Sequence, residues 1–174
     1  MDTRLRMSDA RFMEQALKQA ELAFSAGEFP VGCVIADETK ILAVGSRQGT
    51  AGGRANETDH AEMVALRRLV DVGRDETAGP LSVFCTMEPC LMCFGAILIS
   101  GIHRIVYAYE DVMGGGTGCD LSRLPALYRG TPVEIVPYVM RARSLALFKA
   151  FFSRPDNPYW KYSVLADYTL AQPL

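Results

Sequence analysis

The sequence predicts an α/β domain in which helices lie against a single mixed β-sheet. Helical and strand-like segments alternate along the chain, 174 residues is the length of one domain, and 49% hydrophobic residues are enough for a core without disulfides. No internal repeat or low-complexity linker divides the sequence. We therefore expect one domain over residues 1–174, with residues 153–174 as a C-terminal extension.

The first elements are a helix and a hairpin. Ser8 or Asp9 can cap a helix whose apolar residues recur at helical spacing, and Gly27 can end it. Residues 31–36 and 40–44 are short apolar runs separated by a polar turn. This pattern is typical of two antiparallel strands.

The next helix is expected to begin at a histidine. Residues 45–58 are rich in glycine and polar residues and predict a loop. Asp59 precedes His60, and Glu62 lies three positions after Asp59, which is the spacing of a capping box. We therefore expect a helix from His60 to about residue 70, with His60 and Glu62 in its first turn.

The second half of the chain continues the alternation. Pro89 suits the first turn of a helix that runs to about Ser100, so Cys90 and Cys93 would share one helical face. The other expected elements are strands at 81–86, 103–109 and 133–138, a glycine-rich loop at 114–118, and helices at 141–152 and 160–170.

Cysteine usage and hydropathy indicate the cellular setting. The five cysteines are an odd number without a disulfide pattern, and residues 1–26 resemble a charged helix rather than a secretory signal. The longest apolar run, residues 91–99, is about half of the roughly 20 residues that span a bilayer. We expect a cytoplasmic protein that does not enter the membrane.

The charge balance argues against a general nucleic-acid surface. The net charge is −2 and the pI is near 5.7. A local exception near the C-terminus consists of five basic residues, Arg141, Arg143, Lys149, Arg154 and Lys161. These side chains could contact phosphates, but a solvated amphipathic helix is the more ordinary interpretation, and we favour it.

The most informative residues form two short motifs, His60-Ala61-Glu62 and Pro89-Cys90-Leu91-Met92-Cys93. One histidine and two cysteines are a three-ligand set for Zn²⁺, which leaves the fourth tetrahedral position open for chemistry. The paired motifs are the signature of zinc-dependent base deaminases, in which the glutamate acts as the general acid and base. The predicted reaction is hydrolytic deamination, with Glu62 carrying protons to a ring nitrogen and to the departing amine.

Two other interpretations use the same cysteines. Cys85 could complete a closed structural zinc site, or Cys90 and Cys93 could be a thiol redox pair. Neither interpretation gives Glu62 a role. We therefore favour the catalytic centre.

The chain resembles the cytidine and deoxycytidylate deaminase superfamily, and more narrowly its branch of tRNA adenosine deaminases and guanine deaminases. The resemblance rests on the two zinc motifs, on Gly95-Ala96-Ile97 after them, and on the segment Gly27-Glu28-Phe29-Pro30-Val31-Gly32. It implies a three-layer α/β/α sandwich with a mixed five-stranded sheet, and a homodimer. It also implies Zn²⁺ held by His60, Cys90 and Cys93, proton transfer by Glu62, and a substrate ring held by the backbone of Ala61.

The resemblance also directs attention to the substrate pocket. Relatives commonly carry an asparagine after the second strand that contacts the base or ribose, and Ser46 is the nearest match here, with a shorter reach. Phe29 and Val31 are candidates for the pocket wall. Trp160 lies in an aromatic C-terminal segment that could stack on a base, although such clusters are more often packing.

Three functions are compatible with these features. The first is a zinc-dependent deaminase of a free nucleobase, a nucleoside or a related amino heterocycle, with a purine such as guanine or adenine preferred over cytosine. The alternative is deamination of the wobble adenosine of tRNA, which requires positive surface near the pocket. A non-catalytic zinc module is the third, and the presence of Glu62 argues against it.

Overall fold

The computed structural model describes residues 5–52, 56–73 and 79–173. Its centre is a mixed five-stranded sheet in the order β2-β1-β3-β4-β5. The strand β1 runs antiparallel to both β2 and β3, whereas β3, β4 and β5 are parallel. The strands are β1 Gly32–Ala36, β2 Ile41–Ser46, β3 Ser82–Met87, β4 Arg104–Tyr109 and β5 Glu134–Val136.

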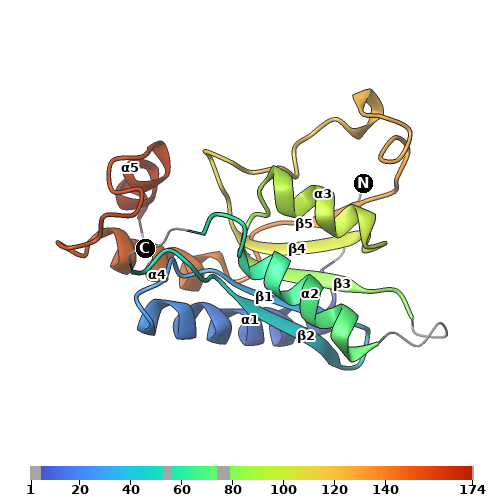
Figure 1. Ribbon diagram of the computed structural model, residues 1–174, viewed down its shortest axis with the longest axis horizontal. Helices are drawn as coiled ribbons and strands as arrows, with labels where there is room; N and C mark the ends of the chain where they lie inside the picture. The colour runs from blue at the N-terminus through green and yellow to red at the C-terminus, as the bar shows by residue number, and fades with distance from the viewer. Residues whose placement is uncertain (1–4, 53–55, 74–78, 174) are drawn as a thin grey trace.

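Helices cover both faces of the sheet, which confirms the predicted three-layer sandwich (Figure 1). The helix α1 lies on one face, and α2 and α3 lie side by side on the other. Near the C-terminus α4 packs against α1 and the sheet, and α5 packs against α4. The helices are α1 Met7–Ser25, α2 Ala61–Val72, α3 Leu91–Ile99, α4 Arg141–Phe152 and α5 Val164–Ala171, with a short 3₁₀ turn at Leu121–Arg123.

The three inner strands β1, β3 and β4 are buried along their whole lengths. A strand that is covered on both faces must be apolar on both faces, which is why these segments read as continuous hydrophobic runs. One core cluster lies between the sheet and α1, around Phe12 and Phe84. The larger cluster lies on the α2 and α3 side and extends to the aromatic residues of α4.

The helix starts differ from the sequence-based expectations. The first helix begins after Arg6, and Asp9 accepts a hydrogen bond from the Arg6 backbone N–H as the third residue of the helix instead of capping it. The N-cap of α2 is His60 rather than Asp59. The carboxylate of Asp59 instead pairs with Arg67 and accepts a hydrogen bond from Asn56. Arg67 and Asn56 therefore occupy the Asp59 carboxylate that was expected to cap α2.

The last elements are shorter than expected. The strand β5 has three residues, and α5 begins at Val164, where the Ser163 side chain caps it, instead of at residue 160. The expected loop at 45–58 begins two residues later, because β2 continues to Ser46, and residues 53–55 of that loop lie outside the described residues. Among the described residues, no helix has the length and apolar character to span a membrane.

One glycine sets the distance between the sheet and α2. A Cβ atom on Gly45 in β2 would lie 2.0 Å from the backbone oxygen of Ala61. Only a residue without a side chain allows this approach. The first turn of α2, which carries the histidine motif, is therefore held directly against the sheet.

Candidate active site

The three predicted zinc ligands converge in space. His60 is the N-cap of α2, Cys90 is the N-cap of α3, and Cys93 lies in the first turn of α3. Nδ1 of His60 lies 3.5 Å from Sγ of Cys90 and 3.5 Å from Sγ of Cys93. A tetrahedral zinc ion with Zn–N near 2.0 Å and Zn–S near 2.3 Å separates its nitrogen and sulfur ligands by about 3.5 Å. The donor set and its spacing therefore fit zinc.

The electrostatics of the two helix starts favour a thiolate. The hydrogen bond from Cys93, with support from His60, lowers the pKa of the Cys90 thiol well below its usual range despite burial. The positive ends of two helix dipoles meet at the same point and act in the same direction. A thiolate is the form of cysteine that binds a metal.

Glu62 lies beside this set. Its side chain is 3% exposed, and its Oε2 accepts a hydrogen bond from Sγ of Cys93 at 3.5 Å. Burial raises the pKa of the Glu62 carboxyl. A raised pKa makes the carboxyl hold a proton more readily, and a general acid and base must both take up and release one.

A closed structural zinc site completed by Cys85 finds no geometric support. Among the described residues, the only cluster of potential metal ligands consists of His60, Cys90 and Cys93. Cys85 lies within β3, and its nearest sulfur partner is Cys33 at 3.9 Å. The three-ligand set therefore keeps a position open for a reactant.

A pocket opens next to the ligands. Its enclosed part measures about 80 Å³, and the space including its open mouth about 500 Å³. Of the predicted substrate residues, Ala61, Phe29, Val31 and Trp160 line it, together with His60, Glu62 and Cys90. Ser46 does not line the pocket, and its neighbour Arg47 does.

Five other residues complete the pocket wall: Met87, Glu88, Asp111, Gly114 and Tyr159. Glu88 could have been suspected, since it stands immediately before the Pro89-Cys90 motif. Asp111 carries no local signal, because it reaches the pocket only when the chain returns after β4. Tyr159 belongs to the aromatic C-terminal segment that the sequence already indicates as a possible stacking surface. Arg47 could have been suspected from its place next to Ser46.

The glycine-rich loop folds over the start of α3. Both oxygens of the Glu88 carboxylate accept hydrogen bonds from this region, Oε1 from Thr117 and Oε2 from the backbone N–H of Asp111. A Cβ atom on Gly116 would lie 2.8 Å from the Cα atom of Leu91. The loop thus supports the helix start that carries Cys90, and glycine is needed for this close contact.

The comparison with known families agrees with this geometry. The model of the cytidine and deoxycytidylate deaminase zinc-binding region matches residues 6–109, which include both motifs. The chain belongs to this family. It is therefore a hydrolase of C–N bonds in cyclic amidines, and it uses zinc.

Similar proteins of this deaminase family include enzymes with different substrates. A tRNA-specific adenosine deaminase of Rickettsia felis is 32% identical over 142 residues, which cover 82% of this chain and 99% of the relative. A solved tRNA:A34 deaminase, active at the wobble position, is 27% identical with a TM-score of 0.65, covering 79% of this chain and 98% of that one. The guanine deaminase of Nitrosomonas europaea has a TM-score of 0.68 at 19% identity, and the match covers 85% of this chain and 86% of that one. At this low identity the similarity shows the fold alone.

Proposed function

We propose that this deaminase removes the exocyclic amine of a purine base, and that its substrate is the wobble adenosine of a tRNA. The observation that carries the substrate is the similarity to tRNA-specific adenosine deaminases, which extends over nearly the whole length of the Rickettsia felis relative. The pocket is consistent with a purine, because aromatic and apolar side chains such as Phe29, Val31 and Trp160 offer a surface for a flat ring, and polar groups such as Glu62 stand beside them.

The roles of the site residues follow from their positions. His60, Cys90 and Cys93 would hold Zn²⁺, which when bound acts as a Lewis acid and lowers the pKa of a water molecule. The Glu62 carboxylate takes one proton from water and gives it to the ring nitrogen. It then takes the second proton from the added hydroxyl group and gives it to the departing amine. The oxygen of water adds to the carbon that bears the amine, the C–N bond breaks, and ammonia leaves.

The remaining pocket residues hold the substrate ring. The backbone N–H of Ala61 is in the first turn of α2, where such groups lack an acceptor within the helix and can donate to the base. Phe29 and Val31 form an apolar wall, and Trp160 lies at the edge where a planar ring can stack. We infer no direct substrate contact for Ser46, which lies outside the pocket wall.

A second candidate is a free purine base or nucleoside. The contacts of the five basic residues near the C-terminus favour this candidate, because each of these side chains is already engaged by a partner within the chain. Arg141 pairs with Glu110, and Arg143 pairs with Glu14. Lys149, Arg154 and Lys161 donate to backbone oxygens of Gln172, Phe24 and Pro155. Side chains engaged in this way offer less positive surface to an anticodon loop.

The organisation of the whole protein completes the proposal. We infer a single domain over residues 1–174 that works in a reducing cytoplasm, because all five cysteines are free thiols. We also infer a homodimer that pairs through α3. The helix exposes Leu91, Met92 and Ile99, whose exposed fractions are 63%, 38% and 61%.

Ammonia release by the zinc-loaded protein tests these candidates. The substrates are adenine, guanine, their nucleosides, and an anticodon stem-loop with adenosine at the wobble position. A stem-loop with guanosine at that position and Glu62→Ala are the controls. Inosine formed only in the first stem-loop supports the tRNA assignment, and turnover of a free base or nucleoside supports the second candidate. No ammonia from any of them would contradict both.

A further inference from the structure

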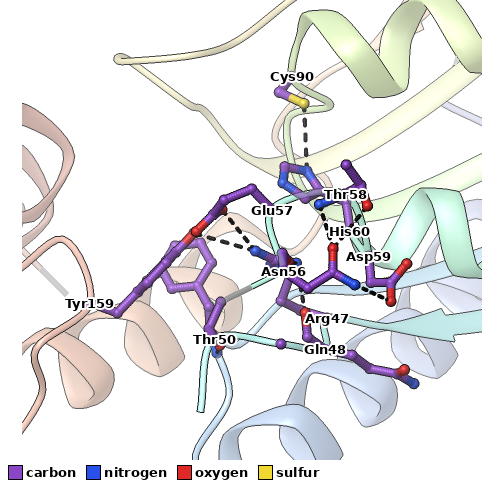
Figure 2. Close-up of polar contacts among 12 residues, drawn as sticks. Arg47, Gln48, Thr50, Asn56, Glu57, Thr58, Asp59, His60, Cys90 and Tyr159 are labelled. Carbon is purple, nitrogen blue, oxygen red and sulfur yellow. Dashed lines mark hydrogen bonds and ion pairs between the residues drawn. The ribbon is translucent and has the colours of Figure 1, made fainter. Parts of the chain in front are cut away.

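Arg47 is a buried charged residue whose partners come from two distant parts of the chain (Figure 2). Only 2% of its surface is exposed. Its Nη1 donates to the backbone oxygens of Gln48 and Asn56, each at 2.7 Å. Its Nη2 donates to Oε2 of Glu57 at 3.0 Å and to the hydroxyl of Tyr159 at 3.5 Å. Protein acceptors thus hold the guanidinium, as a buried charge requires.

Tyr159 completes a triangle with Arg47 and Glu57. Its hydroxyl donates to the same Oε2 of Glu57 at 3.0 Å. Burial raises the pKa of Tyr159 to about 12, so the hydroxyl keeps its proton at neutral pH and remains a donor. These three residues, which we call the Arg47 latch, join the loop before α2 to the C-terminal tail.

The next tail residue adopts a backbone conformation that needs support. Trp160 has a φ of 50°, in the left-handed region that is unfavourable for residues with a Cβ atom. The buried side chain of Asn157 holds the backbone of Tyr159 with two hydrogen bonds. It accepts from the backbone N–H at 2.9 Å and donates to the backbone oxygen at 3.2 Å. The rings of Tyr159 and Trp160 are stacked, with 5.0 Å between their centroids and an interplanar angle of 11°. The place of Trp160 therefore depends on that of Tyr159.

We propose that Arg47 is a positioning residue for the substrate pocket. With Glu57 it holds Tyr159, and through the stacked rings it holds Trp160 as a fixed wall. The four hydrogen bonds of its guanidinium all go to protein acceptors, and one of them reaches Tyr159, so Arg47 acts on the pocket through the tail. The residue that follows Ser46, the nearest match to the base-contacting asparagine of relatives, thus serves a tail contact in this chain. The inference rests on the proposed function only where it concerns substrate affinity.

The position of the tail can be measured without a substrate. Trp160 is the only tryptophan of the chain, so it supplies all of the tryptophan fluorescence. We expect acrylamide to quench this emission about twofold more strongly than in the wild type in three zinc-loaded variants, Tyr159→Phe, Glu57→Gln and Arg47→Gln. Each substitution removes or weakens a hydrogen bond of the Arg47 latch that involves a charged side chain, so Trp160 should become more accessible. Tyr162→Phe is the matched control, since Tyr162 is 88% exposed and lies outside the pocket wall.

Steady-state kinetics then test the effect on the reaction. On whichever of adenosine, guanine and the anticodon stem-loop the wild type deaminates, we expect KM to rise about three- to tenfold in the latch variants while kcat stays within about twofold. If Arg47→Gln fails to fold, Tyr159→Phe and Glu57→Gln keep the side-chain shapes and provide the same test.

Two results would overturn the proposal. The first is quenching and KM in Tyr159→Phe that equal those of Tyr162→Phe. The second is a loss of kcat with an unchanged KM, which would place Arg47 in the chemical step instead of the pocket wall. A wild type that deaminates none of the substrates would contradict the proposed function alone, because the quenching measurement does not require turnover.

Discussion

The metal half of the pocket, which contains His60, Glu62, Cys90 and Cys93, and the tail half, which contains Arg47, Tyr159 and Trp160, are held in place differently. The metal half belongs to the first turns of two helices that pack side by side on one face of the sheet. The tail half depends on side-chain contacts between segments about one hundred residues apart, such as Arg47 with Tyr159.

This difference indicates that the two halves of the pocket control different properties of the enzyme. Helices packed on a sheet fix reacting groups precisely, which chemistry requires. A tail that is held by a few hydrogen bonds can be adjusted without disturbing the metal centre, and it is a suitable place to set substrate affinity. Changes in the metal half should therefore affect zinc binding and kcat, and changes in the tail half should affect KM.

The largest effect is expected from removing a metal ligand. Cys93→Ala should reduce bound zinc from about one ion per chain to a small fraction and abolish deamination, because two donors bind zinc far more weakly than three. Metal analysis of the purified protein measures this. Cys119→Ala, which alters an exposed cysteine, should keep its zinc. Full zinc occupancy in Cys93→Ala would show that the metal half is assigned incorrectly.

Glu62→Gln should separate chemistry from metal binding. The amide keeps the shape of the side chain but cannot carry a proton, so kcat should fall by about 10²- to 10⁴-fold while zinc content stays unchanged. The kinetics of the variant and its metal content are measured together. Glu38→Gln, on an exposed turn, is the control. A kcat within tenfold of the wild type would contradict the role of Glu62.

Trp160→Ala should affect the tail half alone. Loss of a stacking surface should raise KM about tenfold, the usual cost of removing an aromatic side chain from under a base, with little change in kcat or zinc content. Trp160→Phe should recover most of the affinity, since it keeps an aromatic face. A KM equal to that of the wild type in Trp160→Ala would exclude Trp160 from substrate binding.

The smallest effect is expected at Glu28, which supports the loop beside the tail. Its carboxylate accepts hydrogen bonds from the backbone N–H groups of Gly49, Thr50 and Ala51. Burial acts to raise the pKa of Glu28, but the bonds from Thr50 and these backbone groups together hold it below its ordinary value. Glu28→Gln should therefore lower the free energy of unfolding at pH 7 by about 1 kcal/mol, a figure reduced for partial exposure.

The pH dependence of this difference provides the check. A lowered pKa in the folded state means that the stabilisation is present above the ordinary glutamate pKa of 4.5 and is lost as the pH falls through the folded value. Urea unfolding at pH 7 and at successively lower pH should show the wild type losing its advantage over Glu28→Gln in the acidic range. An advantage that does not change with pH would contradict this origin.

Much of the fold and of the metal half could be predicted from local sequence. Apolar periodicity and turn residues indicated every helix and strand, and α4 has the expected bounds. The helix starts were less predictable, because Asp59 had a partner in Arg67 that competes with capping. The tail half was only partly predictable. Trp160 was suspected as an aromatic residue, whereas nothing near Arg47 in the sequence indicates Glu57 or Tyr159 as its partners.

The sequence by itself determined the reaction class, because zinc ligands and their proton carrier are recognised by residue type and by short spacings within a helix turn. Only the tertiary structure decided that Arg47 and not Ser46 lies at the pocket, and that the basic C-terminal side chains are paired. The physical reason is that these facts concern contacts between distant segments. Such contacts depend on how the sheet and helices pack, and no local pattern encodes them.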